Sequence, residues 1–239
     1  MIFKRKSSDV EPPEDVDVDV ADGVDSTDVE SGIDELDAAE ASSEVDWRAD
    51  GPFDSEEVDL DNDAVVRVDL GSLIVTPMPN VSLALQVDQA QKVLAVILEW
   101  APEVKGGAEP QVSQFEVVLY AAPASGRLAE ELMEDIAEEA RDADGTADIE
   151  QGVFGSEVRR VIPIAGPGRQ QAYHTSRIWF VEGPRWALRG TLMGAAAEPD
   201  ADPSLARPFE EFFRNLIVRR GEEAIAPGTV IGLTLPEMG

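Results

Sequence analysis

The chain has 239 residues, with 49 acidic against 19 basic side chains and a formal net charge of −30 at pH 7. Such an acidic surface repels phosphate at long range, so the composition argues against direct binding of nucleic acid. The absence of cysteine excludes disulfides, thiolate nucleophiles and cysteine-ligated metal centres. No apolar run approaches the roughly 18 residues of a membrane span, so we expect a cytoplasmic protein that does not associate with membranes.

Residues 1–63 are far more acidic than the rest of the chain. They carry 23 acidic and 4 basic side chains, and few large apolar ones. A segment of this composition cannot bury enough surface to offset the entropy that it loses on ordering. We therefore predict a disordered acidic N-terminal arm over residues 1–63 and a single folded domain over residues 64–239. Trp47 and Phe53 are aromatic exceptions in the arm, and they should either anchor a partner or strap the arm onto the domain.

The first half of the predicted domain shows strand periodicity and then helix periodicity. Alternating apolar residues predict strands at Val81–Val87, Val93–Trp100 and Gln114–Ala122, the first two as an antiparallel hairpin. From Leu128 onward, apolar residues recur every fourth position, which predicts an amphipathic helix of about 15 residues. The helix should end at Asp144-Gly145, because this pair favours a turn.

The second half repeats this order. After a short link at Asp148–Gly155 we expect three strands with glycine–proline turns between them, at Glu157–Ile164, Tyr173–Glu182 and Arg185–Gly194. A second helix should begin after Asp202, which suits the N-cap position, and bury a face that includes Phe212. Short hairpins force antiparallel neighbours. We therefore predict an α+β fold, with a single, mainly antiparallel sheet of about six strands covered by two helices in the order β-β-β-α-β-β-β-α.

Arginines gather on the strands predicted after the first helix. In a strand, Arg185 and Arg189 share one face, roughly 13 Å apart at about 3.3 Å per residue. Arg177, together with Arg159 or Arg160, could join them from the preceding strands. Because the guanidinium fork binds carboxylate and phosphate, these arginines form our candidate site for an anionic partner segment. The acidic arm itself could also occupy the site.

Two other interpretations of these arginines stay open. In the first, they lie on an exposed face and pair with Glu157 and Glu182, which contributes little to stability. In the second, they bind the phosphate of a small molecule or a nucleotide, either in a binding domain or in an enzyme. Ligands of this class would raise the melting temperature by mass action.

No residue pattern identifies a reaction. His174 is the only histidine, and the chain lacks a phosphate-binding P-loop, a dinucleotide-binding glycine motif and a zinc-protease motif. Asp59–Asp63 begins like a calcium loop, but Ala64 and Leu70 stand where that loop requires Gly and Glu. We therefore expect no catalytic residue, no cofactor and no bound metal. The sequence favours a non-enzymatic interaction or regulatory protein with a protein partner.

Several short segments together resemble a known family. They are Val68–Leu73, Phe154-Gly155, Gly183–Trp186 with Leu188–Gly190, and Arg219–Gly221 with Ala226-Pro227. This combination is similar to an uncharacterised actinobacterial family, domain of unknown function 3710, over about residues 64–236. The family has no assigned activity. The resemblance therefore implies a bacterial cytoplasmic setting but no mechanism.

Overall fold

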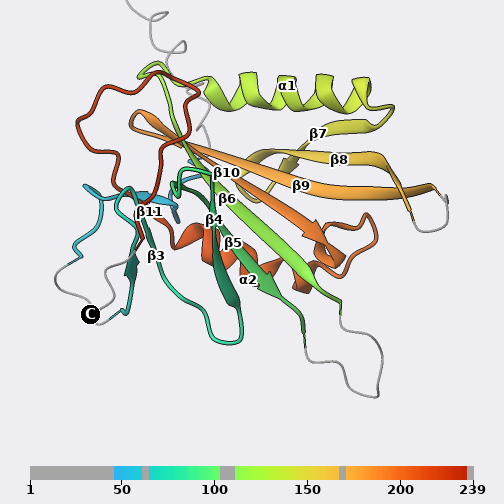
Figure 1. The fold of residues 1–239 in the computed structure, drawn as a ribbon, viewed down its shortest axis with the longest axis horizontal. Helices are drawn as coiled ribbons and strands as arrows, with labels where there is room; N and C mark the ends of the chain where they lie inside the picture. Colours follow the sequence, from blue (N-terminus) through green and yellow to red (C-terminus); the bar gives the residue numbers. More distant parts are fainter. Residues whose placement is uncertain (1–45, 61–64, 103–110, 167–170, 236–239) are drawn as a thin grey trace, which may run out of the picture. The chain divides into compact units, whose positions relative to one another are not determined.

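The computed structural model describes residues 46–60, 65–102, 111–166 and 171–235 of the chain. These residues form two β-sheets, two α-helices and the short 3-10 helices η2 (Ala195–Ala197) and η3 (Pro203–Leu205) (Figure 1). The predicted single sheet of about six strands covered by two helices is wrong. The fold is mostly β, with one sheet of seven strands and another of four. Among the described helices, none is both long and apolar enough to cross a membrane.

The larger sheet is antiparallel throughout, in the order β4-β5-β6-β10-β9-β8-β7. Its strands are β4 (Ser82–Val87), β5 (Val93–Trp100), β6 (Ser113–Ala121), β7 (Thr146–Gly152), β8 (Gly155–Ala165), β9 (Gln171–Gly183) and β10 (Trp186–Gly194). Two runs of consecutive strands, β4 to β6 and β7 to β10, join where β10 pairs with β6. Most of β7 falls in the link that we expected at 148–155. Its exposed side chains lack the apolar alternation of a half-buried strand.

The smaller sheet gathers four very short strands in the order β1-β11-β3-β2. They are β1 (Phe53–Asp54), β2 (Val68–Asp69), β3 (Leu73–Val75) and β11 (Ile217–Val218). β1 pairs in parallel with β11, with Phe53 opposite Ile217. β1 therefore lies within residues 1–63, the predicted arm, and takes part in the fold. Residues 1–45 and 61–63 of that arm are outside the described residues.

The described part of the arm, residues 46–60, crosses the domain as a strap. Asp54 is buried, and its Oδ2 accepts a 2.8 Å hydrogen bond from the Trp186 indole N–H. Both outer nitrogens of Arg48 donate to the carboxylate of Glu57. The Trp47 ring lies against the turn between β7 and β8. These contacts agree with the strap that was one of two expected roles for Trp47.

The two helices lie on opposite faces of the larger sheet. Helix α1 (Leu128–Asp142) contacts β7, β8 and β9, and α2 (Arg207–Arg214) is seen behind β5 (Figure 1). Successive side chains of β6 point to opposite faces of the sheet. Phe115 packs with α2 and the smaller sheet, whereas Tyr120 packs with α1. Helix α1 has the position and length predicted from the apolar residues that recur at every fourth position.

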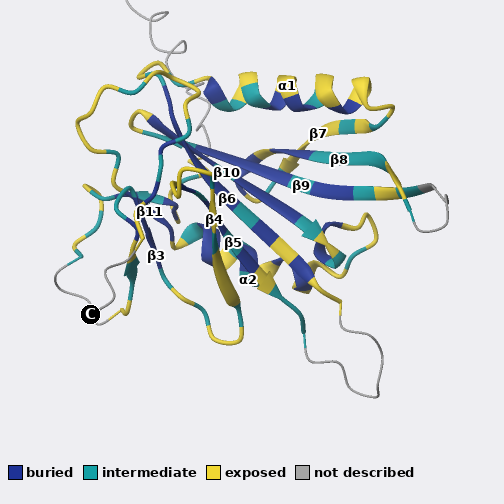
Figure 2. Ribbon diagram, in the orientation of Figure 1, coloured by how far each residue is buried: buried dark blue, intermediate teal, exposed yellow. Residues whose placement is uncertain are grey.

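The main core lies between the larger sheet, α2 and the smaller sheet. Buried residues concentrate along β6, β9 and β10 (Figure 2). An aromatic cluster fills the centre of this core with ring centroids 4.9–5.9 Å apart, formed by Phe115, Phe154, Trp179, Phe209 and Phe213. Gly190 on β10 makes room for it, since a Cβ at that position would lie 2.4 Å from the Phe115 ring.

Candidate functional site

Arg159 and Arg177 stand opposite each other on β8 and β9, on the face that carries α2. Between them lies Glu157, which is only 1% exposed. Its carboxylate accepts hydrogen bonds of 3.1 Å from Arg159 Nε, 3.1 and 3.0 Å from Arg177, and 3.0 Å from the Trp179 indole. Arg159 also lies 2.9 Å from Glu150. These two arginines therefore pair with Glu157, as one of our alternative interpretations expected, but the carboxylate is buried and not on the exposed face that this interpretation assumed.

Arg185 lies in the turn before β10 rather than on the strand. Its φ of 60° is in the left-handed region, and β10 begins at the next residue. The Arg185 guanidinium donates to the Gly221 carbonyl at 3.1 Å. The predicted partner Glu182 instead accepts hydrogen bonds from the backbone N–H groups of Arg127 and Leu128 at the start of α1. Arg185 and Arg189 thus do not share a strand face.

Arg189 on β10 points to the opposite face from Arg159 and Arg177, the face that also carries α1. Its guanidinium donates to Glu116 on β6 at 2.8 Å and lies 5.6 Å from the centroid of the Tyr120 ring. The buried Nε of Arg189 has no hydrogen-bond partner within the described part of the chain. Arg189 is therefore only partly satisfied by its surroundings.

Arg160 shares this face with Arg189, whereas Arg159, the other residue considered for the site, lies on the opposite face. Because neighbours in a strand point to opposite faces, only one of the two could join Arg189. Arg160 Nε donates to Ser176 Oγ at 3.1 Å, and no carboxylate lies within salt-bridge distance of Arg160 among the described residues. Burial lowers the pKa of Arg160, with Glu139 acting against this shift and the charge of Arg189 adding to it. Arg160 is thus a half-buried cation that its neighbours neutralise poorly.

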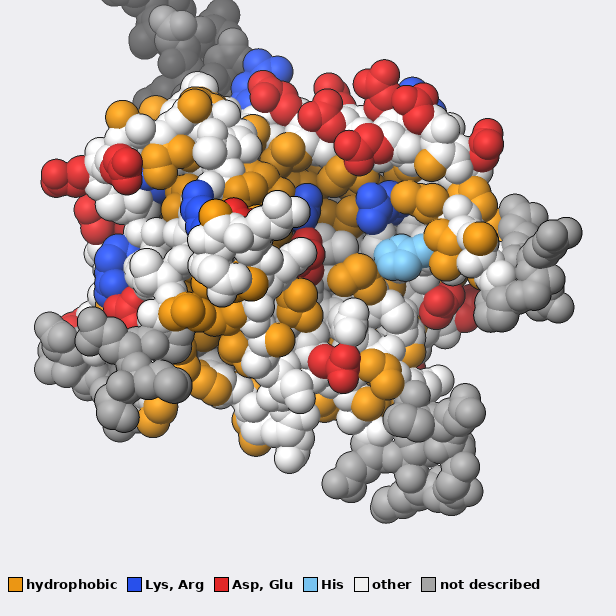
Figure 3. Space-filling model, in the orientation of Figure 1, with side chains coloured by type: hydrophobic (Ala, Val, Ile, Leu, Met, Phe, Trp, Pro, Cys, Tyr) orange, Lys and Arg blue, Asp and Glu red, His pale blue; other side chains and the backbone are white. Residues whose placement is uncertain are grey.

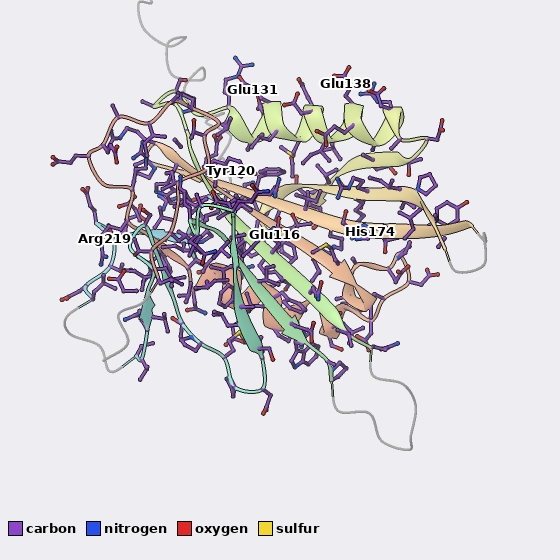
Figure 4. All side chains as sticks on the ribbon, viewed as in Figure 1. Glu116, Tyr120, Glu131, Glu138, His174 and Arg219 are labelled. Atoms are coloured by element: carbon purple, nitrogen blue, oxygen red, sulfur yellow. The ribbon has the colours of Figure 1, made fainter. Side chains whose placement is uncertain are left out.

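We call the group of Glu116, Tyr120, Arg160, Ser176 and Arg189 the arginine face. Basic side chains are visible on this side of the molecule, below the acidic side chains of α1 (Figure 3). Figure 4 shows Glu116 and Tyr120 over the central strands, whereas Glu131 and Glu138 of α1 point away from the sheet. His174 on β9 lies farther along the same side. The face therefore combines two guanidiniums with polar neighbours.

Tyr120 adds an unpaired hydroxyl to the arginine face. The residue is 8% exposed, and no described group bonds to its hydroxyl. Burial raises the pKa of Tyr120, Arg189 lowers it and Glu116 raises it, so the phenol stays protonated at neutral pH and can donate. The described residues hold no cluster of three or more His, Asp or Glu side chains suited to a metal ion. The arrangement is suited to binding an anion by hydrogen bonds and charge.

A concave region lies beside the smaller sheet, with a volume of about 640 Å³. Its arginines are already engaged. Arg219 donates to Asp69 at 2.8 Å, and Arg220 donates to the backbone carbonyls of Arg185 and Glu223 at 3.1 Å. Because both arginines already donate to acceptors of the chain, this region is a weaker candidate for an anion than the arginine face.

Comparison with known proteins identifies the family but no activity. The family model described as "Protein of unknown function (DUF3710)" matches residues 51–238. The chain therefore belongs to this family, which confirms the resemblance seen in the sequence. The match begins before β1, so it includes the strand that part of the predicted arm contributes. No curated protein matches the chain.

Proposed function

We propose that this chain is a non-enzymatic, cytoplasmic binding domain, and that its arginine face receives an anionic segment of a protein partner. The cytoplasmic setting rests on the sequence alone. The observation that carries the proposal is Arg160, a half-buried guanidinium with no ion pair among the described residues. An arriving carboxylate would gain a charge-assisted hydrogen bond from Arg160 without first breaking a salt bridge.

The neighbours of Arg160 support a site for more than one charged group. Arg160 and Arg189 lie on the same face of the larger sheet, opposite Ser176 and Phe180 of β9, so we expect one extended acidic segment to contact both guanidiniums. The Tyr120 hydroxyl offers a neutral donor beside Arg189. Glu116 already engages Arg189, and it therefore selects against a ligand that approaches Arg189 alone.

The acidic surface of the chain sets the conditions for binding. With a net charge of −30, the chain repels anions at long range, and salt screens this repulsion. Contact at the arginine face acts at short range and is screened less because Arg160 is half-buried. An acidic peptide should therefore associate slowly at low salt, and its binding should depend on the side chains of Arg160 and Arg189.

The test is titration calorimetry of the full chain with an oligoglutamate peptide. Binding should be lost in Arg160→Gln and in Arg189→Gln. Arg159→Gln is the matched control, because it removes the same charge one residue away, on the opposite face. Loss of binding in all three variants alike, or in none, would contradict the proposal. Circular dichroism and melting curves establish that each variant is folded.

The same experiment separates the partner segment from a small phosphate ligand. Inorganic phosphate, pyrophosphate and nucleotides would be titrated beside the peptide. Tighter binding of one of them at Arg160 would favour the alternative function, a domain for small phosphorylated molecules. Binding of the peptide through the arginine face alone would support the proposed function as an interaction domain.

A further inference from the structure

The edge strand β4 carries no charge and no proline. Its sequence is SLALQV, and five of its six residues are exposed. Among the described residues, β4 pairs with β5 alone, so its other side presents free backbone N–H and C=O groups. Natural sheets usually protect such an edge with charged side chains, proline, bulges or a covering segment, because an open edge recruits another strand.

The opposite edge of the same sheet has this protection. Strand β7 carries Asp148 and Glu150 on either side of Ile149, and Glu150 pairs with Arg159 on the neighbouring strand. A strand that approaches β7 meets charged side chains. The absence of such residues on β4 is therefore specific to that edge and not a general property of this sheet.

The pattern of β4 is complementary to itself. The strand pairs regularly with β5 from Ser82 to Gln86, and the register shifts only between Gln86 and Val87. The regular part has Ala84 at its centre. When two copies pair in antiparallel orientation about Ala84, Leu83 of one lies opposite Leu85 of the other, and Ser82 lies opposite Gln86. Apolar residues thus meet apolar residues on one face, and polar residues meet on the other.

From this pattern we propose that two copies of the chain associate through β4, so that the larger sheet continues across a twofold axis. Such an isologous contact uses the same strand from both copies. Leu85 already packs against the main core, and Leu83, 36% exposed, would be covered by the partner. The pairing also keeps like charges apart, since Asp88 after β4 falls opposite Asn80 of the partner rather than the partner's Asp88.

The net charge of the chain gives this association a distinctive salt dependence. Two chains of −30 each repel at long range, whereas the paired strands contribute no charge. Added salt screens the repulsion and leaves the backbone hydrogen bonds and leucine contacts nearly unchanged. Association through β4 should therefore strengthen with salt, the opposite of an interface made by salt bridges.

Light scattering coupled to gel filtration tests the proposal on the full chain. We expect a mass of twice 25.8 kDa that dissociates on dilution and persists to lower concentration at high salt. Leu83→Lys should yield a monomer at all concentrations, because it places like charges in the paired strands. Ile149→Lys on β7 is the matched control, an exposed residue on the opposite edge strand, and should remain dimeric.

Two results would overturn the proposal. One is a wild-type chain that stays monomeric at high concentration and high salt. The other is a dimer that Leu83→Lys leaves intact. The far-ultraviolet circular dichroism spectrum of Leu83→Lys should match that of the wild type, and its melting curve should match that of the wild type at concentrations where the wild type has dissociated. Val87→Lys offers a second edge variant if they do not. Val87 is 42% exposed on the same strand and lies opposite Val81 of the partner.

Discussion

Replacing Glu157 by Gln should strongly destabilise the domain. In the native structure, four hydrogen bonds from Arg159, Arg177 and Trp179 end on this carboxylate. Glutamine removes the negative charge and directs an amide N–H₂ toward guanidinium donors. Arg177, whose side chain is 14% exposed, is then left without its counter-charge. Breaking a buried ion pair from one side costs about 3–5 kcal/mol.

The size of this effect can be checked against a matched variant. Glu150→Gln removes a carboxylate that lies 2.9 Å from the same Arg159, but the Glu150 side chain is 51% exposed. An exposed ion pair contributes about 0–1 kcal/mol. At roughly 2–4 °C per kcal/mol for a domain of this size, Glu157→Gln should lower Tm by about 6–20 °C and Glu150→Gln by a few degrees.

Urea unfolding followed by tryptophan fluorescence gives both free energies, with thermal melts as a second measurement. If the two variants differ by less than about 1 kcal/mol, the argument that burial makes Glu157 essential would be refuted. A large and equal loss in both variants would contradict it as well, because exposure would then have no effect on the cost.

Two further predictions concern the core and the strap. Gly190→Ala should cost about 1–3 kcal/mol in urea unfolding, because the new methyl group meets the Phe115 ring, and an unchanged free energy would contradict the close packing. The hydrogen bonds from Arg48 lower the pKa of Glu57 below its ordinary 4.5, so this carboxylate contributes stability above that pH and loses it as pH falls through the lowered value. Glu57→Gln should therefore be less stable than the wild type at pH 7 and equal to it at strongly acid pH, and a constant difference across this range would contradict the ion pair.

Several elements lie where their periodicity predicted them. Helix α1 shows its four-residue spacing because only one side packs on the sheet. Strands β4, β5 and β6 lie close to their predicted ranges. The smaller sheet could not be predicted in this way, because strands of two or three residues are too short to show a period. The pairing of Phe53 with Ile217 also joins residues far apart in the chain.

The arginine face illustrates a second limit. When a sheet is covered on both sides, both sets of alternating side chains are buried, and the sequence does not tell which set faces which helix. Arg159 and Arg160 were therefore equivalent in the sequence. The structure separates them, since Val158 packs with α1, and Arg160 shares its face, whereas Arg159 lies with Glu157. The sequence named Glu157 as a partner of the arginines but did not indicate its burial, because a buried carboxylate cannot be recognised among 49 acidic residues.

The central claim is that Arg160 and Arg189 bind an anionic partner segment, and NMR of the arginine side chains tests it most directly. The Nε–Hε signals of Arg159, Arg160, Arg177 and Arg189 would be followed in the full chain while oligoglutamate is added. The account predicts that the Arg160 and Arg189 signals shift together and saturate, while those of Arg159 and Arg177 stay in place on the opposite face. Shifts confined to Arg159 and Arg177, or no shift at any of the four, would contradict it.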